Sequence, residues 1–396
     1  MKLNFKVFLF VQYFSLGIWG PYLPVYLHDK QFSEWQIGLL LGTMPIVMMI
    51  SQPVWSYLSD ILRTRRSLLV ISCLSSAIAW IALGLANQFL YVFLWTSLFS
   101  ALWTPVNPVS TAILLETLEE TGEAEKYSLV RLWGSIGFAV ASFLIGWLFL
   151  EQISAYLAWF TGGTYFILGG LSLLLPEKRG PLVGQTLKGR QILAGNPRLV
   201  IYLIASIFIG ATLGIYNNYQ ALFLQFLDAE AWLLGLTVSL QAIAEVPLML
   251  LVPLALKRFS AQAIILAGAV LLPLRWALYF FIQRPEWVAP SQLIHGLAIV
   301  SFYVVGVSYI DHLISPDWRA TGQGLYGAAL NGIGSALGLY LAGLALAWFD
   351  IRSVWGLSFI LGVIGLGLLL FAFRRKGRGE ENEVKTTGVH MQDIEV

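Results

Sequence analysis

Residues 199–226 read LVIYLIASIFIGATLGIYNNYQALFLQF, a run without a single charged residue. A helix needs roughly 20 apolar residues to cross the ~30 Å hydrocarbon core of a bilayer, so this run predicts a transmembrane helix. Working outward from it, similar blocks separated by short polar segments predict twelve spans: 5–27, 36–58, 67–86, 91–115, 128–150, 155–175, 199–226, 232–256, 261–282, 287–313, 320–347 and 352–373.

The composition agrees with a membrane protein. Hydrophobic residues make up 58% of the chain and charged residues 12%, whereas soluble domains average roughly 45–50% and about 25%. Strands of alternating polarity are absent, and lipid offers the backbone no hydrogen-bond partner, so helices are the expected spanning structure. The sequence predicts an all-α membrane protein.

Several classes of function are disfavoured by the inventory of reactive residues. The chain has one cysteine, Cys73, and four histidines, with no cluster of metal-ligand spacing and no nucleophile beside a base. The net charge of +2 indicates no nucleic-acid partner. We therefore expect neither an enzyme nor a metal or cofactor site.

The basic residues lie almost entirely on one side of the predicted spans. The opposite side holds only Lys30, Arg284 and Arg352. Lysine and arginine collect in cytoplasmic loops, so both termini are expected in the cytoplasm and the chain in the cytoplasmic (inner) membrane. The predicted inside residues are Lys2, Lys6, Arg63, Arg65, Arg66, Lys126, Lys178, Arg179, Lys188, Arg190, Arg198, Lys257, Arg258, Arg319 and those of the tail from Arg374.

An internal repeat divides the chain into two halves. GIWGPYLPVYL from Gly17 matches GIYNNYQALFL from Gly214, and IGFAVASFLIG from Ile136 matches IGSALGLYLAG from Ile333. Both matches have an offset of 197 residues, which also relates Gly38 to Gly235. Two duplicated six-helix halves, with a substrate site near the midplane between them, are the architecture of many secondary transporters.

The repeat and the polar stretches predict the domain organisation. An N-terminal six-helix half occupies 1–175 and a C-terminal six-helix half occupies 199–373. The polar segment 176–198 is expected to be a cytoplasmic central loop. The charged segment 374–396 has no apolar face and is expected to be a disordered cytoplasmic tail.

Ionisable residues inside the spans are the first candidates for a site, since a charge at the bilayer centre costs about 2.5–3.5 kcal/mol. Glu245 lies about 13 residues into the eighth span, some 20 Å along the helix axis and thus near the midplane. Gln241 lies one turn away on the same face. Glu245 either locks helices together in a neutral or paired form, or takes up and releases a proton during transport.

The ninth and tenth spans each carry a basic residue. Arg275 cannot become tolerable in lipid by losing its charge, so it needs an anion. That anion is either Glu245, in a structural bridge, or a negative group of the substrate. His295 either satisfies a structural hydrogen bond or contacts a polar solute through its ring nitrogens.

Polar residues in the fifth and seventh spans add further candidates. Arg131 opens the fifth span, with Ser135 one turn later, and it either binds solute or extends to the interface. The seventh span carries YNNYQ, in which Asn217 and Gln220 either join helices or bind a hydroxylated or heterocyclic ligand. In the fourth span, Pro105 and Pro108 predict a kink around Asn107, and Glu116 near its cytoplasmic end is expected to be solvated.

The segment after the second span reads Ser56-x-x-x-Asp60-Ile61-Leu62-Arg63-Thr64-Arg65-Arg66. It resembles the signature Gly-x-x-x-Asp-Arg/Lys-x-Gly-x-Arg/Lys-Arg/Lys of the major facilitator superfamily, a group of transporters with twelve helices in two halves. Asp60, Arg65 and Arg66 match that signature, whereas Ser56, Ile61 and Arg63 depart from it. The resemblance implies a conformational latch formed by Asp60, Arg65 and Arg66.

The stretch VRLWGSIGF from Val130 resembles the fifth helix of the nucleoside:proton symporters and the related phenylpropionate permeases. The same resemblance extends to Ala244-Glu245-Val246, LRWAL around Arg275, Gln292-x-x-His295 and SPDWRATGQG from Ser315. It implies a proton-driven symporter in which Arg131, Asn217, Glu245 and His295 contribute to the binding cavity.

Two departures qualify this resemblance. The wider group that includes lactose permease has Lys-x-x-His-x-x-Glu on the tenth helix, where this chain has Gln292, His295 and Ala298. Val300 stands where the nucleoside symporters have an aspartate. Proton coupling would therefore fall to Glu245, with His295 as a second candidate.

Together these features predict a proton-coupled symporter that imports a small organic solute by alternating access. The candidate solutes are a nucleoside, an aromatic carboxylate or a sugar, and the chain is expected to act as a monomer. A proton-coupled antiporter and a facilitative uniporter are the alternatives. The predicted substrate-binding residues are Arg131, Ser135, Asn217, Gln220, Gln241, Glu245, Arg275 and His295.

Overall fold

The structure is a computed structural model that describes residues 2–62, 64–123, 126–149, 153–178, 196–314 and 319–374. Only the two ends of the predicted central loop and the first residue of the predicted tail fall within these ranges; the rest of both lies outside the described residues. The domain boundaries therefore stay predictions.

The described residues form helices joined by short turns, with no strand among them. In the first half the helices are α1 (Lys2–Trp19), α2 (Leu23–Asp29), α3 (Glu34–Leu62), α4 (Arg65–Leu85), α5 (Phe89–Trp103), α6 (Val106–Glu120), α7 (Tyr127–Phe149) and α8 (Ile153–Ser172).

The second half contains four long helices and two spans that are built from several pieces. Its helices are α10 (Pro197–Phe226), α11 (Ala231–Leu256), α12 (Ala261–Phe281), α13 (Gln292–Ile299), η4 (Val300–Val305), α14 (Gly306–Leu313), α15 (Arg319–Gly327), η6 (Ala328–Gly334), α16 (Ser335–Leu346) and α17 (Arg352–Arg374), with a short 3-10 turn, η3 (Pro285–Trp287). Both η4 and η6 are π-helical segments, a geometry that often marks functional positions.

Ten of the helices or helix pairs in the described ranges are long and apolar enough to cross a membrane. The remaining two spans are α1, which packs along α7, and α8, which packs along α4. Together they form the predicted all-α membrane fold of twelve transmembrane helices in two six-helix halves. Some predicted spans are broken: the first at Gly20–Tyr22 and the fourth at Thr104–Pro105.

The turns after the first and seventh spans show that the two halves repeat each other in structure. Gln31 and Asp228, which are 197 residues apart, have positive φ angles of 62° and 53°. After each of them, a backbone N–H returns to a carbonyl five residues earlier, at 3.3 Å in the first half and 3.0 Å in the second. This is the bonding of a Schellman helix end, and it recurs at the offset that the sequence predicts.

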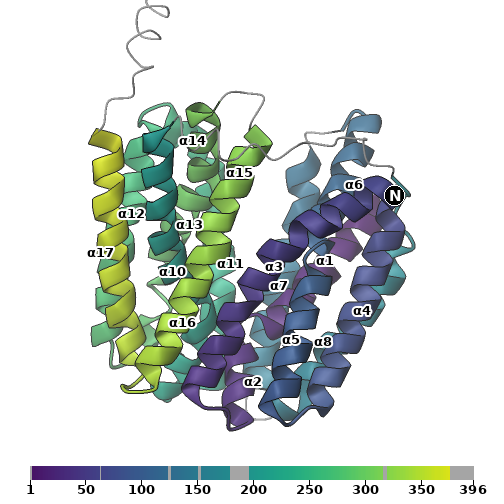
Figure 1. The fold of residues 1–396 in the computed structure, drawn as a ribbon, viewed down its shortest axis with the longest axis horizontal. Coiled ribbons are helices and arrows are strands. Elements are labelled where there is room, and N and C mark those ends of the chain that lie inside the picture. The colour runs from purple at the N-terminus through teal and green to yellow at the C-terminus, as the bar shows by residue number, and fades with distance from the viewer. Residues whose placement is uncertain are drawn as a thin grey trace, which may run out of the picture.

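The halves meet at one end of the bundle and diverge at the other. We call the end where α1 begins at Lys2 and α17 ends at Arg374 the terminal face. Figure 1 shows α3 and α16 adjoining at the opposite end and the ribbons of the two halves spreading apart towards the terminal face.

Two glycine contacts allow the halves to approach closely at the end opposite the terminal face. A methyl group added to Gly38 would lie 2.5 Å from the Cα of Gly343, and one added to Gly146 would lie 2.7 Å from the Cα of Gly235. The 197-residue offset converts Gly38 into Gly235 and Gly146 into Gly343. The second contact is therefore the repeat copy of the first, and α3–α16 and α7–α11 are equivalent interfaces between the halves.

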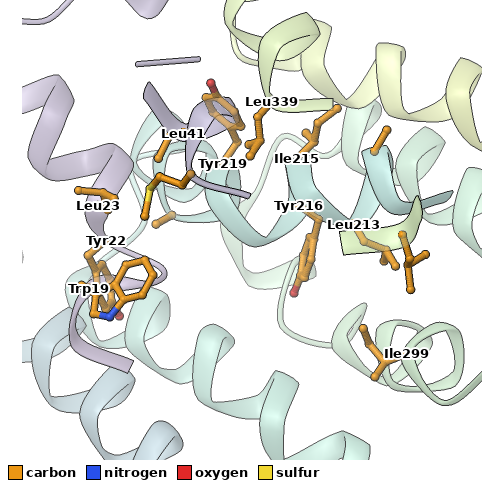
Figure 2. Packing of buried hydrophobic residues seen from close by; sticks show 14 of the residues in the cluster. Trp19, Tyr22, Leu23, Leu41, Leu213, Ile215, Tyr216, Tyr219, Ile299 and Leu339 are labelled. Atoms are coloured by element: carbon orange, nitrogen blue, oxygen red, sulfur yellow. The ribbon is translucent and has the colours of Figure 1, made fainter. Parts of the chain in front are cut away.

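The hydrophobic core continues across these interfaces. Figure 2 shows Leu41 of α3, Leu339 of α16 and Tyr219 of α10 in one part of the cluster, where the halves meet. Two hydrogen bonds accompany this packing: the hydroxyls of Thr43 and Tyr340 lie 2.9 Å apart, and Ser239 Oγ donates to a backbone carbonyl of α7 at 2.8 Å. Apolar packing and these two hydrogen bonds together join the halves at this end.

Candidate functional site

The wall contributed by the first half is centred on Arg131, in the first turns of α7. Its guanidinium carbon lies 4.0 Å from the ring centroid of Tyr13 on α1, a cation–π contact. Gly134 leaves room for both groups, because a methyl group there would lie 2.7 Å from Arg131 Nη1. The hydroxyl of Tyr13 donates to Asn107 Oδ1 at 3.0 Å, and Gln12 Nε2 donates to the same oxygen at 3.3 Å.

Asn107 owes its position to the proline-rich break in the fourth span. The predicted kink is confirmed, with the helix interrupted at Thr104 and Pro105 and resumed at Val106. The side chain of Asn107 is exposed, whereas Gln12 is buried. The break therefore presents one amide in the middle of a transmembrane span.

The wall contributed by the second half is centred on Glu245 of α11. Gln241 lies one turn away on the same helix, as predicted, and its Nε2 lies 3.5 Å from Asn217 Oδ1 of α10. Glu245 is close enough to Tyr303 of η4 for its charge to act on that hydroxyl. Tyr303 in turn donates to Asn331 Oδ1 of η6 at 2.6 Å.

The two walls carry opposite charges, Arg131 on the first half and Glu245 on the second. Arg131 is close enough to Glu245 for the two charges to interact, although the residues belong to different halves. Neither side chain takes part in the direct ion pairs found among the described residues. Each half thus carries one of two opposite charges that are not directly bonded to each other.

A second polar cluster lies behind the wall of the second half. Arg275 is fully buried, and its Nη1 donates to His295 Nδ1 at 2.7 Å. Its Nη2 donates to the hydroxyl of Tyr279 at 3.0 Å and to Gln292 Oε1 at 3.1 Å. The ring of Tyr216 lies 4.2 Å from the guanidinium carbon. Arg275 is therefore held by neutral hydrogen-bond partners and aromatic faces rather than by Glu245.

This arrangement also fixes the tautomer of His295. Arginine only donates hydrogen bonds, so Nδ1 must accept and a single ring proton resides on Nε2. Among the described residues Nε2 has no hydrogen-bond partner. The imidazole is fully buried, and its ring centroid lies 4.3 Å from that of Tyr216.

The predicted binding residues thus fall into two groups. Ser135, Asn217, Gln241, Glu245 and Arg131 keep part of their surface exposed, whereas Gln220, Arg275 and His295 are buried. The Tyr216 hydroxyl connects the groups, lying 2.5 Å from Gln292 Oε1 and 3.2 Å from Gln241 Oε1.

The predicted latch residues lie at the terminal face. Arg65 forms an ion pair with Glu116 of α6, and Arg66 Nε lies 3.5 Å from Glu177 Oε2. The side chain of Asp60 lies outside the described residues. Glu116, which is expected from the sequence to be solvated, keeps 33% of its side chain exposed and also pairs with Arg65 at the start of α4.

Sequence reasoning missed four residues of the two walls: Tyr13, Asn107, Tyr303 and Asn331. The available signal was an asparagine near the middle of an apolar span, since an amide in lipid requires a partner. The tyrosines gave no comparable signal because aromatic residues are abundant throughout the spans.

A sequence model of the MFS_1 like family matches residues 2–357. The chain belongs to this family. As a member of the MFS_1 like family it is a multi-pass membrane transporter and not an enzyme.

Two of the proteins similar to this chain in sequence are named as permeases. A maltose permease of Geobacillus stearothermophilus is 28% identical over 96% of this chain and 97% of its own length. A xanthosine permease of Escherichia coli (strain K12) is 25% identical over 89% of this chain and 90% of its own. The crystal structure of the nucleoside transporter NupG superposes with a TM-score of 0.85 at 22% identity, covering 95% of this chain and 99% of that one. The last comparison confirms the fold.

Proposed function

We propose that this transporter is a proton-coupled symporter that imports a small organic solute across the cytoplasmic membrane. The observation that carries the proposal is the pair Arg131 and Glu245, which oppose each other from the two halves without a direct bond. An ionised side chain within a span is costly. Two such charges on opposite sides of the interface between the halves indicate an interaction that changes during the transport cycle rather than a fixed salt bridge.

The coupling follows from the cost of leaving one charge unpaired. In the empty carrier, ionised Glu245 balances Arg131, and the halves can close over the pair. Protonation of Glu245 leaves Arg131 without a counter-charge, and closure then costs several kcal/mol unless another group solvates the guanidinium. A bound solute supplies that group. The carrier therefore closes when it is empty or when it holds both proton and solute.

The remaining predicted residues take two roles in this proposal. Ser135, Asn217 and Gln241 join the charged pair as the surface that contacts solute. Arg275 and His295 support that surface through Tyr216, and Gln220 is buried behind it. With His295 Nδ1 occupied by Arg275, Glu245 is favoured as the proton-carrying group. No cofactor is needed, because the proton gradient supplies the free energy.

Orientation and solute class are also part of the proposal. We infer from the excess of basic residues that the terminal face is cytoplasmic, in which case the ribbons of the two halves in Figure 1 spread apart towards the cytoplasm. The names of the relatives support a nucleoside or a sugar as solute, and the D-xylose–proton symporter shares the fold with a TM-score of 0.72 at 14% identity. A monomer contains the whole site.

Uptake into proteoliposomes with an imposed pH gradient tests the proposal. Acid outside should drive accumulation of solute above its external concentration, and dissipating the gradient with a protonophore should abolish the excess. An antiporter would be opposed by the same gradient and a uniporter would be unaffected. Either of those outcomes removes symport from this protein.

A further inference from the structure

The two walls of the site share a feature that the charged pair does not explain. On each wall a tyrosine hydroxyl donates to the side-chain oxygen of an asparagine: Tyr13 to Asn107 in the first half and Tyr303 to Asn331 in the second. Both asparagines are exposed within transmembrane spans. Since the oxygen of each amide is already occupied, the Nδ2 group, which carries two N–H donors, is left available.

Neither Nδ2 group donates a hydrogen bond to any residue that the structure describes. This contrasts with Asn218 of α10, whose Nδ2 donates to a carbonyl of its own helix at 2.9 Å, and with Asn4, whose Nδ2 donates to Leu174 O at 3.2 Å. An amide that is fixed through its oxygen and unused at its nitrogen is oriented to donate to something else.

Each asparagine is also tied to one member of the charged pair. Tyr13 supports Asn107 through its hydroxyl and Arg131 through the face of its ring. Tyr303 supports Asn331 through its hydroxyl and lies within reach of the charge of Glu245. Each wall thus combines one charge, one tyrosine and one outward amide, although the residues come from non-equivalent helices.

We propose that Asn107 and Asn331 are solute-binding residues that donate hydrogen bonds from opposite halves to an uncharged, oxygen-rich solute, namely a glycoside such as a disaccharide or a nucleoside. This rests on the proposed transport function. Hydroxyl, ring-ether and carbonyl oxygens all accept from amide N–H groups, so one pair of donors serves both kinds of glycoside.

The charges of the site favour this class over a carboxylate. Arg275, the natural partner for a carboxylate, is sealed among aromatic rings and neutral acceptors. Arg131 is balanced by Glu245 in the empty carrier, and once Glu245 is protonated the hydroxyl or carbonyl oxygens of a neutral solute can accept from its guanidinium. The amide donors of Asn107 and Asn331 likewise need acceptors, and a neutral acceptor satisfies an amide donor without adding a charge to the site.

Placing one amide on each half also suits alternating access. A glycoside has oxygens along its whole length and can accept from both walls at once. Both hydrogen bonds form only when the walls approach, so the solute stabilises the closed state more than the open one. A ligand shifts such an equilibrium only by its difference in affinity for the two states.

Binding to the purified protein in detergent, with no gradient present, tests the proposal separately from coupling. The probes are maltose, sucrose, uridine and xanthosine, with 3-phenylpropionate as the carboxylate. The variants Asn107→Leu and Asn331→Leu should each weaken glycoside binding at least tenfold. Tyr13→Phe and Tyr303→Phe, which keep the ring and remove the hydroxyl that donates to the amide oxygen, should weaken it about threefold. The matched control Asn4→Leu should stay within twofold of wild type.

The outcomes separate clearly. Glycoside affinities within twofold of wild type in both asparagine variants overturn the proposal, and so does a wild-type protein that binds only 3-phenylpropionate or none of the four glycosides. If an asparagine variant does not fold, the phenylalanine variant on the same wall decides. Loss of glycoside binding in these variants, in a protein that fails the pH-gradient assay, supports the binding residues and rejects the symport.

Discussion

The aromatic cores of the two halves are centred on equivalent residues but differ in the groups that surround them. In the first half, Trp19 packs against Phe99, Trp103 and Trp80, with centroid distances of 5.2, 5.5 and 6.1 Å. Its indole N–H donates to the hydroxyl of Tyr165 at 3.2 Å. This core is aromatic throughout and carries no charge.

In the second half the equivalent of Trp19, 197 residues later, is Tyr216. Its ring packs 5.5 Å from Trp276, much as Trp19 packs on its neighbours. However, it also covers the guanidinium of Arg275, and its hydroxyl lies 2.5 Å from Gln292 Oε1. Both halves therefore have an aromatic core at this position, and in the second half that core also encloses a hydrogen-bonded cation, Arg275.

The glycine contacts between the halves differ from the aromatic cores in this respect, because the residues at the duplicated positions are identical. This difference teaches that closure requires the same geometry on both sides of the interface, while the buried hydrogen-bonded cation is needed behind only one wall of the site. A packed aromatic core provides rigidity, whereas a network of hydrogen bonds orients the side chains that face it.

The largest effect is expected where the halves are still alike. Gly38→Leu and Gly235→Leu should each reduce transport roughly 30- to 150-fold, because overpacking the interface costs about 2–3 kcal/mol in the closed state. Initial uptake rates in proteoliposomes measure this. Gly170→Leu is the matched control, since no atom outside its own helix lies within 4 Å of a methyl group placed there. Equal rates in all three variants would break the link between these contacts and closure.

A second effect, measured on stability rather than on transport, is expected where the halves differ. Arg275→Leu should lower the free energy of unfolding by roughly 3 kcal/mol, because His295, Tyr279 and Gln292 lose a buried partner. Trp19→Phe, in the equivalent core of the first half, should cost only about 1–1.5 kcal/mol. Thermal unfolding of the detergent-solubilised variants measures both. If Trp19→Phe proves the more damaging, the polar network is not what holds the second half.

The smallest effect concerns two helix ends that are capped by similar means. Lys30 Nζ donates to the carbonyl of Ala86 at 2.6 Å, just after α4, and Arg352 Nη1 donates to the carbonyl of Ile282 at 2.6 Å, just after α12. Lys30→Met and Arg352→Met should each lower the free energy of unfolding by about 1 kcal/mol. Costs that differ by more than twofold would show that the two caps are not equivalent.

Much of this fold could be predicted from the sequence because lipid imposes simple rules on length and polarity. The spans, the duplication at 197 residues and the shared face of Gln241 and Glu245 all depend on local spacing. The break at Thr104–Pro105 followed from proline chemistry. The π-helical segments had no such signal, since they depend on how neighbouring helices pack.

The site was less predictable because its contacts join distant helices. The sequence left Arg275 with two possible anions, and the structure gives it His295, Gln292 and Tyr279 instead. Spacing along one helix cannot reveal a partner on another. The tyrosine-held asparagines were missed for the same reason, since each pair becomes visible only when two helices are placed side by side.

The most direct test of the Arg131–Glu245 pair compares net uptake with exchange in Glu245→Gln. A neutral glutamine mimics the protonated state, so the solute-loaded carrier should still close, and solute exchange should stay within about threefold of wild type. The empty carrier, with Arg131 unbalanced, should not return, and accumulation driven by the pH gradient should fall to background. Full gradient-driven accumulation by Glu245→Gln would contradict the account.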